Sequence, residues 1–227
     1  RDLVRSRGLG DVYKRQRVYG LLGENGAGKS TLMKILAGYE SPTTGEVVVD
    51  GAVRVPGGGS RAAEAQGIVL IHQEFNLADD LTIAQNIFLG HEIKRGPFLD
   101  DKAMREKTRA ALAQVGLPLD PDTRVRKLIV AEKQLVEIAR ALARNARLLI
   151  MDEPTATLTP GETERLFALM AGLKAAGVTI IYISHKLDEV ERTTDEVVVM
   201  RDGLLVAREA TAVSYTHLTL PTSDLVE

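Results

Sequence analysis

Short apolar runs recur along this chain, separated by longer segments that mix apolar and polar residues. Four runs, at 18–22, 68–71, 148–151 and 179–183, are almost entirely apolar. Such runs are typical of strands that are buried on both faces of a sheet. The segment 131–144 instead repeats apolar residues at the i, i+3, i+4, i+7 spacing that forms one face of a helix.

The segments between and after these runs predict further helices and strands. Further helices are predicted after the first run through Leu36, and over 82–89, 101–115 and about 160–176. Further strands are predicted at 46–50 and in a hairpin of 197–200 with 204–207, which flank the turn Asp202-Gly203. Strands that alternate with helices indicate an α/β fold with a mainly parallel sheet and helices on both faces.

Both ends of the chain differ in character from its middle. Residues 11–16 read DVYKRQ and residues 213–217 read VSYTH. One DNA segment explains both. Read in one orientation it encodes DVYKRQ, and its reverse complement, read in another frame, encodes VSYTH. This segment resembles the transposase mosaic-end adapter of sequencing libraries. We therefore expect 1–16 and 213–227 to be adapter-derived flanks, and 17–212 to be the native part of a longer protein.

Composition narrows the possible functions. The 227 residues carry a net charge of −2, are 44% apolar and include no cysteine. A near-neutral charge argues against a generic binder of polyanions. The absence of cysteine excludes disulfide scaffolds, thiolate zinc sites and cysteine nucleophiles. The apolar runs are shorter than the roughly 20 residues that span a membrane, so we expect a soluble, intracellular domain.

The most specific motif is GENGAGKST at 23–31, here called the phosphate loop. It matches G-x-x-x-x-G-K-[ST] and stands between a predicted strand and a predicted helix, as that motif requires. Glycines let backbone N–H groups face phosphate oxygens, Lys29 would reach the β- and γ-phosphates, and the Ser30 hydroxyl would bind Mg²⁺. The expected nucleotide-binding residues are Gly23, Glu24, Asn25, Gly26, Ala27, Gly28, Lys29, Ser30 and Thr31.

A second motif, LLIMDEP at 148–154, places two carboxylates at the end of a buried strand. Asp152 would hold the Mg²⁺ hydration shell near Ser30. Glu153 would face the γ-phosphate and orient or deprotonate the attacking water. Together the two motifs indicate a nucleotide hydrolase.

Four further segments resemble those of ATP-binding-cassette (ABC) ATPases. Gln73 in GIVLIHQE resembles the Q-loop, residues 127–143 the cassette signature and its helix, and His185 in YISHKLDEV the switch histidine. The segment TATLT at 155–159 resembles the D-loop. The resemblance implies a P-loop NTPase cassette with a mainly parallel core, a small antiparallel β part and a helical subdomain at about 76–145. It also implies that Gln73, Glu153 and His185 form the catalytic group, and that Ser30, Gln73 and Asp152 surround Mg²⁺.

Two further segments are similar in sequence to one branch of this family. NIFLGHE at 86–92 and SPTTGEVVVDG at 41–51 resemble the first cassette of bacterial monosaccharide importers of the ribose, galactose and xylose type. That resemblance implies ATP hydrolysis that powers sugar import, with a second cassette on the same longer chain. It further implies membrane permease subunits, an indirect periplasmic sugar-binding partner, no nucleic acid, and a peripheral location on the cytoplasmic face of the inner membrane.

Two departures from the family pattern matter. The signature begins Leu128-Ile129 where the family has Leu-Ser, so the hydroxyl that binds the opposite γ-phosphate is missing. We therefore expect one competent and one degenerate site in the longer protein. The family's adenine-stacking aromatic falls within the first flank; neither Tyr13 nor Tyr19 is assigned to that role, and Tyr19 is expected in the strand before the phosphate loop.

Two other functions fit parts of the sequence. A non-transport ABC ATPase that acts on ribosomes or DNA would share every motif above, although such proteins typically add a long coiled coil or a basic linker. A nucleotide-binding module without turnover is the other reading, and the fragment on its own could behave in that way.

Overall fold

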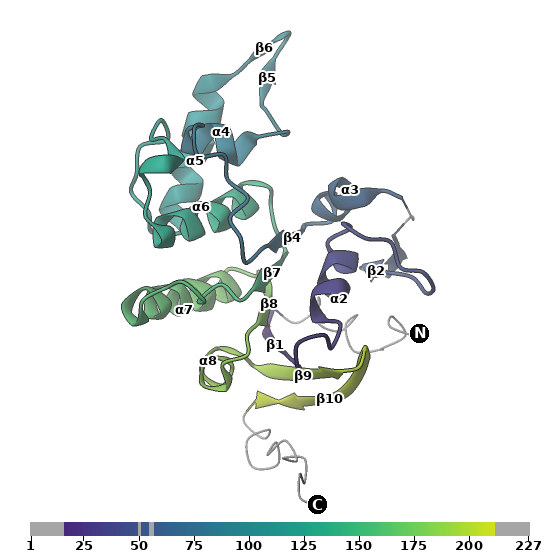
Figure 1. The fold of residues 1–227 in the computed structure, drawn as a ribbon. Coiled ribbons are helices and arrows are strands. Elements are labelled where there is room, and N and C mark those ends of the chain that lie inside the picture. Colours follow the sequence, from purple (N-terminus) through teal and green to yellow (C-terminus); the bar gives the residue numbers. More distant parts are fainter. Residues whose placement is uncertain (1–15, 50, 55–56, 212–227) are drawn as a thin grey trace, which may run out of the picture.

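The computed structural model describes residues 16–49, 51–54 and 57–211 (Figure 1). The predicted flank 213–227 and nearly all of the flank 1–16, including Tyr13, lie outside the described residues. Among the helices that are described, none combines the length and apolar character that crossing a bilayer requires.

The central sheet has six strands in the order β10-β9-β1-β8-β7-β4. Their bounds are β1 Val18–Leu22, β4 Ile68–Ile71, β7 Leu148–Asp152, β8 Thr179–Ile183, β9 Glu196–Arg201 and β10 Leu204–Ala210. All neighbouring pairs are parallel except β9 with β10. The predicted mainly parallel sheet is therefore confirmed, and its apolar strands are the neighbours β1, β8 and β7 together with the edge strand β4.

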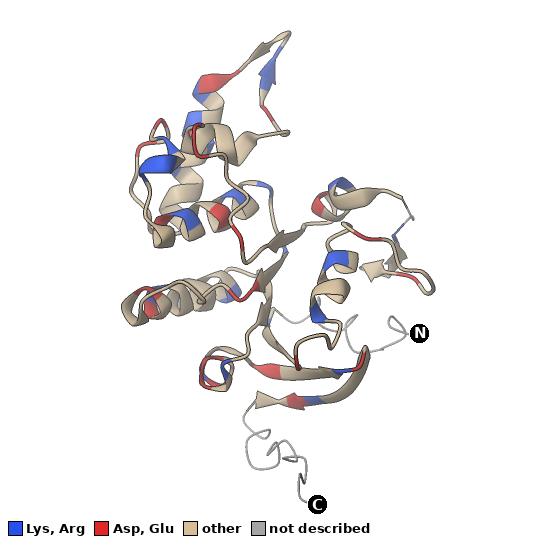
Figure 2. Ribbon diagram, viewed as in Figure 1, with Lys and Arg blue, Asp and Glu red and all other residues tan. Residues whose placement is uncertain are grey.

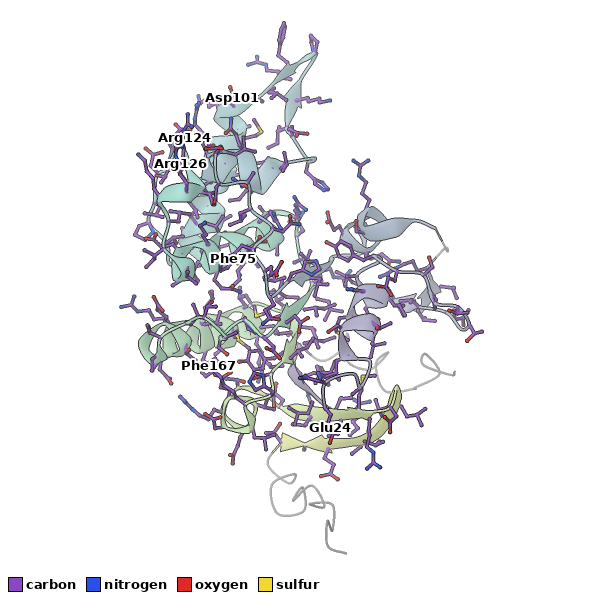
Figure 3. All side chains as sticks on the ribbon, viewed as in Figure 1. Glu24, Phe75, Asp101, Arg124, Arg126 and Phe167 are labelled. Atoms are coloured by element: carbon purple, nitrogen blue, oxygen red, sulfur yellow. The ribbon has the colours of Figure 1, made fainter. Side chains whose placement is uncertain are left out.

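Helices cover both faces of this sheet, because alternate residues of each strand point to opposite sides. In β7, Leu148 and Ile150 pack in one cluster with α2 (Lys29–Leu36) and α3 (Gly59–Ala65). Their neighbours Leu149 and Met151 pack in the other cluster with α6 (Val130–Ala143), α7 (Pro160–Ala175) and α8 (Leu187–Thr193). On that second face the ring of Phe167, labelled in Figure 3, meets Tyr182 of β8 edge to face at 6.2 Å between centroids.

The chain between β4 and β7 forms a helical region that extends to one side of the sheet (Figure 1). It contains α4 (Ile83–Phe88), α5 (Asp101–Gln114), a 3₁₀ turn at Val125–Lys127, and α6 (Val130–Ala143). Ile83, Leu112 and Val136 are fully buried among these helices, so the region has a core that continues into the sheet's second face. A two-stranded hairpin, β5 (Lys94–Arg95) with β6 (Phe98–Leu99), projects from it.

A small antiparallel ladder of β2 (Val48–Val49) and β3 (Ala52–Val53) lies beside α2, where a longer strand is predicted. Acidic and basic residues are interspersed along the sheet and along the helical region in Figure 2, which fits the net charge of −2.

Candidate functional site

The phosphate loop connects the end of β1 to the start of α2. Gly26 and Gly28 adopt left-handed φ angles of 85° and 93°, which residues with a Cβ rarely adopt. Gly28 is the N-cap of α2, and no side chain caps the helix. The amides of the first helical turn therefore point into the loop as hydrogen-bond donors, which is the arrangement that an anionic group requires.

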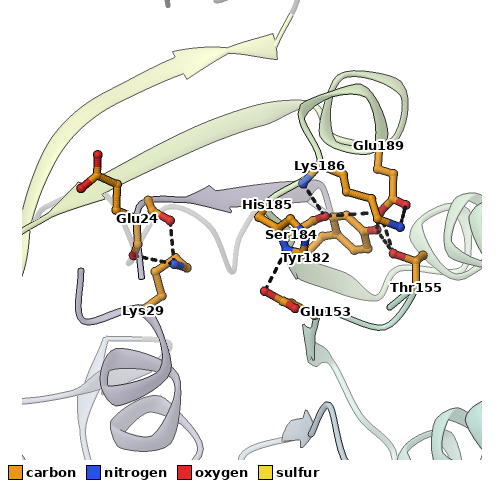
Figure 4. A network of polar contacts seen from close by, with 10 residues as sticks. Glu24, Lys29, Glu153, Thr155, Tyr182, Ser184, His185, Lys186 and Glu189 are labelled. Atoms are coloured by element: carbon orange, nitrogen blue, oxygen red, sulfur yellow. Dashed lines mark hydrogen bonds and ion pairs between the residues drawn. The ribbon is translucent and has the colours of Figure 1, made fainter. Parts of the chain in front are cut away.

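The amine of Lys29 folds back across the phosphate loop (Figure 4). Its Nζ donates to the carbonyl oxygens of Gly23 at 2.7 Å and Glu24 at 3.0 Å. The carboxylate of Glu24 is exposed and points away from the loop, so this residue contributes its backbone carbonyl rather than its charge. The positive charge of Lys29 is thus held at the rim of the loop by hydrogen bonds to two backbone carbonyls.

A cavity of about 300 Å³ collects most of the predicted site residues. It is lined by Asn25, Gly26, Ala27, Gly28, Lys29, Ser30, Thr31, Gln73, Asp152 and Glu153. These residues follow three different strands, β1, β4 and β7, whose carboxyl ends meet at one edge of the parallel sheet. The structure therefore brings together the phosphate loop, Gln73 and the carboxylate pair.

The two carboxylates differ in their surroundings. Burial, and then the neighbouring Glu153, raise the pKa of Asp152, whereas His72 and Lys29 act in the opposite direction. Glu153 has a left-handed φ of 46°, and its N–H donates to the Ile183 carbonyl at 3.0 Å. A non-glycine residue in this conformation costs about 1–3 kcal/mol, and such strain concentrates at functional sites.

His185 follows β8 and meets Glu153 across the strand ends. Its Nδ1 lies 3.1 Å from Glu153 Oε1, and its imidazole is largely exposed. Because a carboxylate can only accept, this contact places the imidazole proton on Nδ1 and leaves Nε2 as an acceptor when the ring is neutral. His185 is therefore joined to the cavity through Glu153.

The oxygen groups in the cavity fit Mg²⁺. This ion prefers one or two carboxylates, a hydroxyl, phosphate oxygens and water over an all-protein cage. The cavity offers Asp152, the Ser30 hydroxyl and the Gln73 amide oxygen, and no cluster of three or more His, Cys, Asp or Glu occurs among the described residues. Burial is the main cause of the raised pKa of Asp152, because it disfavours the negative charge, and a bound cation would offset that cost.

Neutralising Asp152 should stabilise the nucleotide-free chain. The pKa of Asp152 is raised in the folded chain, so folding disfavours its charged form, and the free-energy cost of that charge grows as the pH rises through the folded-state pKa. Asp152→Asn removes this cost at neutral pH. We expect the melting temperature in EDTA to rise by about 2 °C, measured by calorimetry. The exposed Asp188→Asn is the matched control and should leave it unchanged; a lower melting temperature for Asp152→Asn would contradict the expectation.

The second residue of the predicted signature is an exposed isoleucine. Ile129 is the N-cap of α6, has extended backbone angles of −74° and 165°, and is 60% exposed. Glu132 Oε2 accepts from the Ile129 N–H at 3.0 Å, which is one half of a capping box. The other half needs a side-chain oxygen at the N-cap, and isoleucine has none.

Ile129→Ser should therefore raise the free energy of unfolding by about 1 kcal/mol, because it supplies the missing N-cap acceptor. Urea denaturation of the chain measures this. Val130→Ser, one residue further on and also exposed, adds the same hydroxyl where it cannot cap, so it should bring no gain. An equal gain for both variants would show that the effect is not capping.

Some features of the site were not predicted from the sequence. The Gly203 N–H, in the turn between β9 and β10, donates to the Ala27 carbonyl of the phosphate loop at 3.0 Å. A Cβ on Gly23 would lie 2.4 Å from the Met200 carbonyl oxygen, so the loop packs directly on β9. The Asp202-Gly203 turn was predicted, but only the strand order places it against the loop.

Tyr19 lies in β1 as predicted, and it is buried.

A second unpredicted feature is a buried polar network around Glu189 of α8, beside His185 (Figure 4). In the sequence, the one signal of this network is the acidic residue four positions after His185. Acidic residues in short helices are common and are usually exposed, so this one could not be singled out.

A family model described as ABC transporter matches residues 11–156 of the chain. Ribose import ATP-binding protein RbsA 3 of Rubrobacter xylanophilus is 49% identical over 210 residues, which cover 92% of this chain and 40% of that protein. Ribose import ATP-binding protein RbsA of Rhodopirellula baltica is 51% identical over 191 residues, covering 84% of this chain and 37% of that protein. The chain thus spans about 40% of the length of these curated relatives.

Among solved structures, the ADP conformation of MJ1267, an ATP-binding cassette of an ABC transporter, superposes with a TM-score of 0.78. It is 27% identical and the match covers 91% of this chain and 85% of that one. The sheet order and the attached helical region are therefore those of a solved ATP-binding cassette.

Proposed function

Because this chain belongs to the ABC transporter family, we propose that it binds Mg²⁺-ATP and hydrolyses it to ADP and phosphate as one cassette of a longer protein. The observation that carries the proposal is the cavity in which Lys29, Ser30, Asp152 and Glu153 meet. His185 contributes a second polar group to the site, because its Nδ1 contacts Glu153, the proposed general base.

In the proposed reaction, Lys29 leaves the Gly23 and Glu24 carbonyls and donates to phosphate oxygens, together with the amides at the start of α2. Ser30, Asp152 and Gln73 would hold Mg²⁺, whose charge offsets that of the phosphates. Glu153 orients the attacking water and takes its proton. His185 keeps the Glu153 carboxylate in place, and its free Nε2 edge is available for the γ-phosphate.

We propose further that the ATPase drives import of a monosaccharide. The relatives named above are ribose import ATP-binding proteins, and their greater length leaves room for a second cassette on the same chain. In this proposal the protein sits peripherally on the cytoplasmic face of the bacterial inner membrane, with permease subunits as direct partners and a periplasmic sugar-binding protein as an indirect one. The ATP-binding domain is residues 17–212, with a helical subdomain at about 76–145 that includes α4, α5 and α6.

Two measurements test this function. Calorimetry should show that the chain binds ATP when Mg²⁺ is present, and absence of binding would contradict the nucleotide site. The longer protein should co-purify with permease subunits, and its ATP hydrolysis in vesicles should rise when sugar-loaded binding protein is added. Co-sedimentation with ribosomes or DNA in place of permeases would instead favour a non-transport ATPase.

A further inference from the structure

Glu189 is a buried carboxylate that the proposed reaction does not use. It lies on α8, is 5% exposed, and receives four hydrogen bonds from side chains (Figure 4). Its Oε2 accepts from Thr155 Oγ1 at 2.7 Å, Tyr182 OH at 2.6 Å and Ser184 Oγ at 3.3 Å. Its Oε1 accepts from Lys186 Nζ at 2.9 Å.

The positions of these donors in the chain make the network informative. Thr155 comes two residues after Glu153, and Ser184 and Lys186 stand on either side of His185. The Lys186 N–H also donates to Ser184 Oγ at 3.1 Å, which closes the backbone around His185. One carboxylate therefore ties down the segments that carry both members of the Glu153–His185 pair.

The network is built around a charge. Burial alone raises the pKa of Glu189, but hydrogen bonds from Tyr182, Thr155 and Lys186 outweigh it and bring the pKa below the usual range. An ionised, buried carboxylate is tolerated only with donors of this number and geometry. Loss of its charge would weaken these four hydrogen bonds, and an amide in its place would keep only one acceptor oxygen for the four donors.

We propose that Glu189 is a positioning residue, which holds the segments after β7 and β8 so that Glu153 Oε1 and His185 Nδ1 stay within hydrogen-bond distance. This inference rests on the proposed function for its catalytic meaning. Its geometric content concerns the chain alone: without the Glu189 carboxylate, His185 loses the contact that fixes its proton on Nδ1.

The tautomer of His185 reports this contact directly. In long-range ¹H–¹⁵N spectra of the labelled 227-residue chain above pH 8, the unchanged chain should show His185 protonated on Nδ1. Glu153→Ala sets the value for a lost contact. Glu189→Gln, which keeps the volume but removes the charge, should move the ¹⁵N shifts of His185 at least halfway toward that value. ATP affinity by calorimetry should stay within about twofold, because Glu189 does not touch the phosphate loop.

Glu191→Gln is the matched control, because it removes an exposed charge from the same helix. The proposal is overturned if Glu189→Gln keeps the tautomer of the unchanged chain, or if Glu191→Gln shifts it equally. If Glu189→Gln does not fold, Thr155→Val and Tyr182→Phe each remove one donor; both should shift the tautomer in the same direction, and no shift in either overturns the proposal. The spectra need no nucleotide, so failure of the chain to bind ATP would contradict the proposed function while this result stands.

Discussion

Glu153→Gln should lower the rate of ATP hydrolysis by about 10²–10⁴-fold, the usual contribution of a general base. The amide keeps the size of the carboxylate but cannot take a proton from water. Phosphate release by the longer two-cassette protein measures the loss, and ATP affinity should be retained, because the phosphate loop is untouched. Glu106→Gln, an exposed change on α5, is the control and should leave the rate unchanged.

Unchanged hydrolysis in Glu153→Gln would contradict two expectations together. It would remove Glu153 as the base, and it would show that the phosphate loop of this chain is not part of the competent site in the longer protein. The phosphate-loop site of this cassette would then be degenerate, in addition to the signature at Ile129.

Lys29→Ala should weaken ATP binding by at least about 100-fold, or roughly 2.7 kcal/mol, because it removes charge-assisted hydrogen bonds to the phosphates. In the nucleotide-free chain, Lys29 makes two hydrogen bonds to backbone carbonyls at the edge of the phosphate loop, which water can replace. The variant should therefore fold normally. Calorimetric titration with Mg²⁺-ATP measures the change.

Lys34→Ala is the matched control, since Lys34 is exposed on the same helix and pairs with Glu40 at 3.6 Å. It should leave ATP affinity within about twofold. A dissociation constant for Lys29→Ala within about threefold of the unchanged chain would contradict the assignment of the cavity to phosphate.

Four strands of the sheet could be predicted because β1, β4, β7 and β8 are buried on both faces and so are almost entirely apolar. Elements held by tertiary contacts escaped prediction. The helix α3 begins at Gly59, the third of three consecutive glycines, yet its Ala63 is fully buried against the sheet. The short helix α8 depends on Val190 in the core and on the Glu189 network, and neither leaves a helical repeat long enough to detect.

The residues of the site could be predicted, but their geometry could not. The motifs place Lys29, Asp152 and Glu153 at strand ends, and parallel strands bring those ends together. The left-handed backbone of Glu153 and its 3.1 Å contact with His185 depend on the register of β7 against β8. No local pattern encodes a register between segments so distant in the chain, so this part of the site requires the three-dimensional structure.

The strand order has a consequence for how the protein is made. The first strand, β1, pairs with β8 and β9, and the phosphate loop receives its hydrogen bond from Gly203. A ribosome adds about 5–20 residues per second, so the roughly 160 residues between β1 and β8 take about 10–30 s to emerge. For that interval, β1 is an apolar segment without its neighbours, exposed to other nascent chains and to chaperones. A translation product that stops between α2 and β8 carries the complete phosphate loop without the strands that pair with β1 and without Gly203.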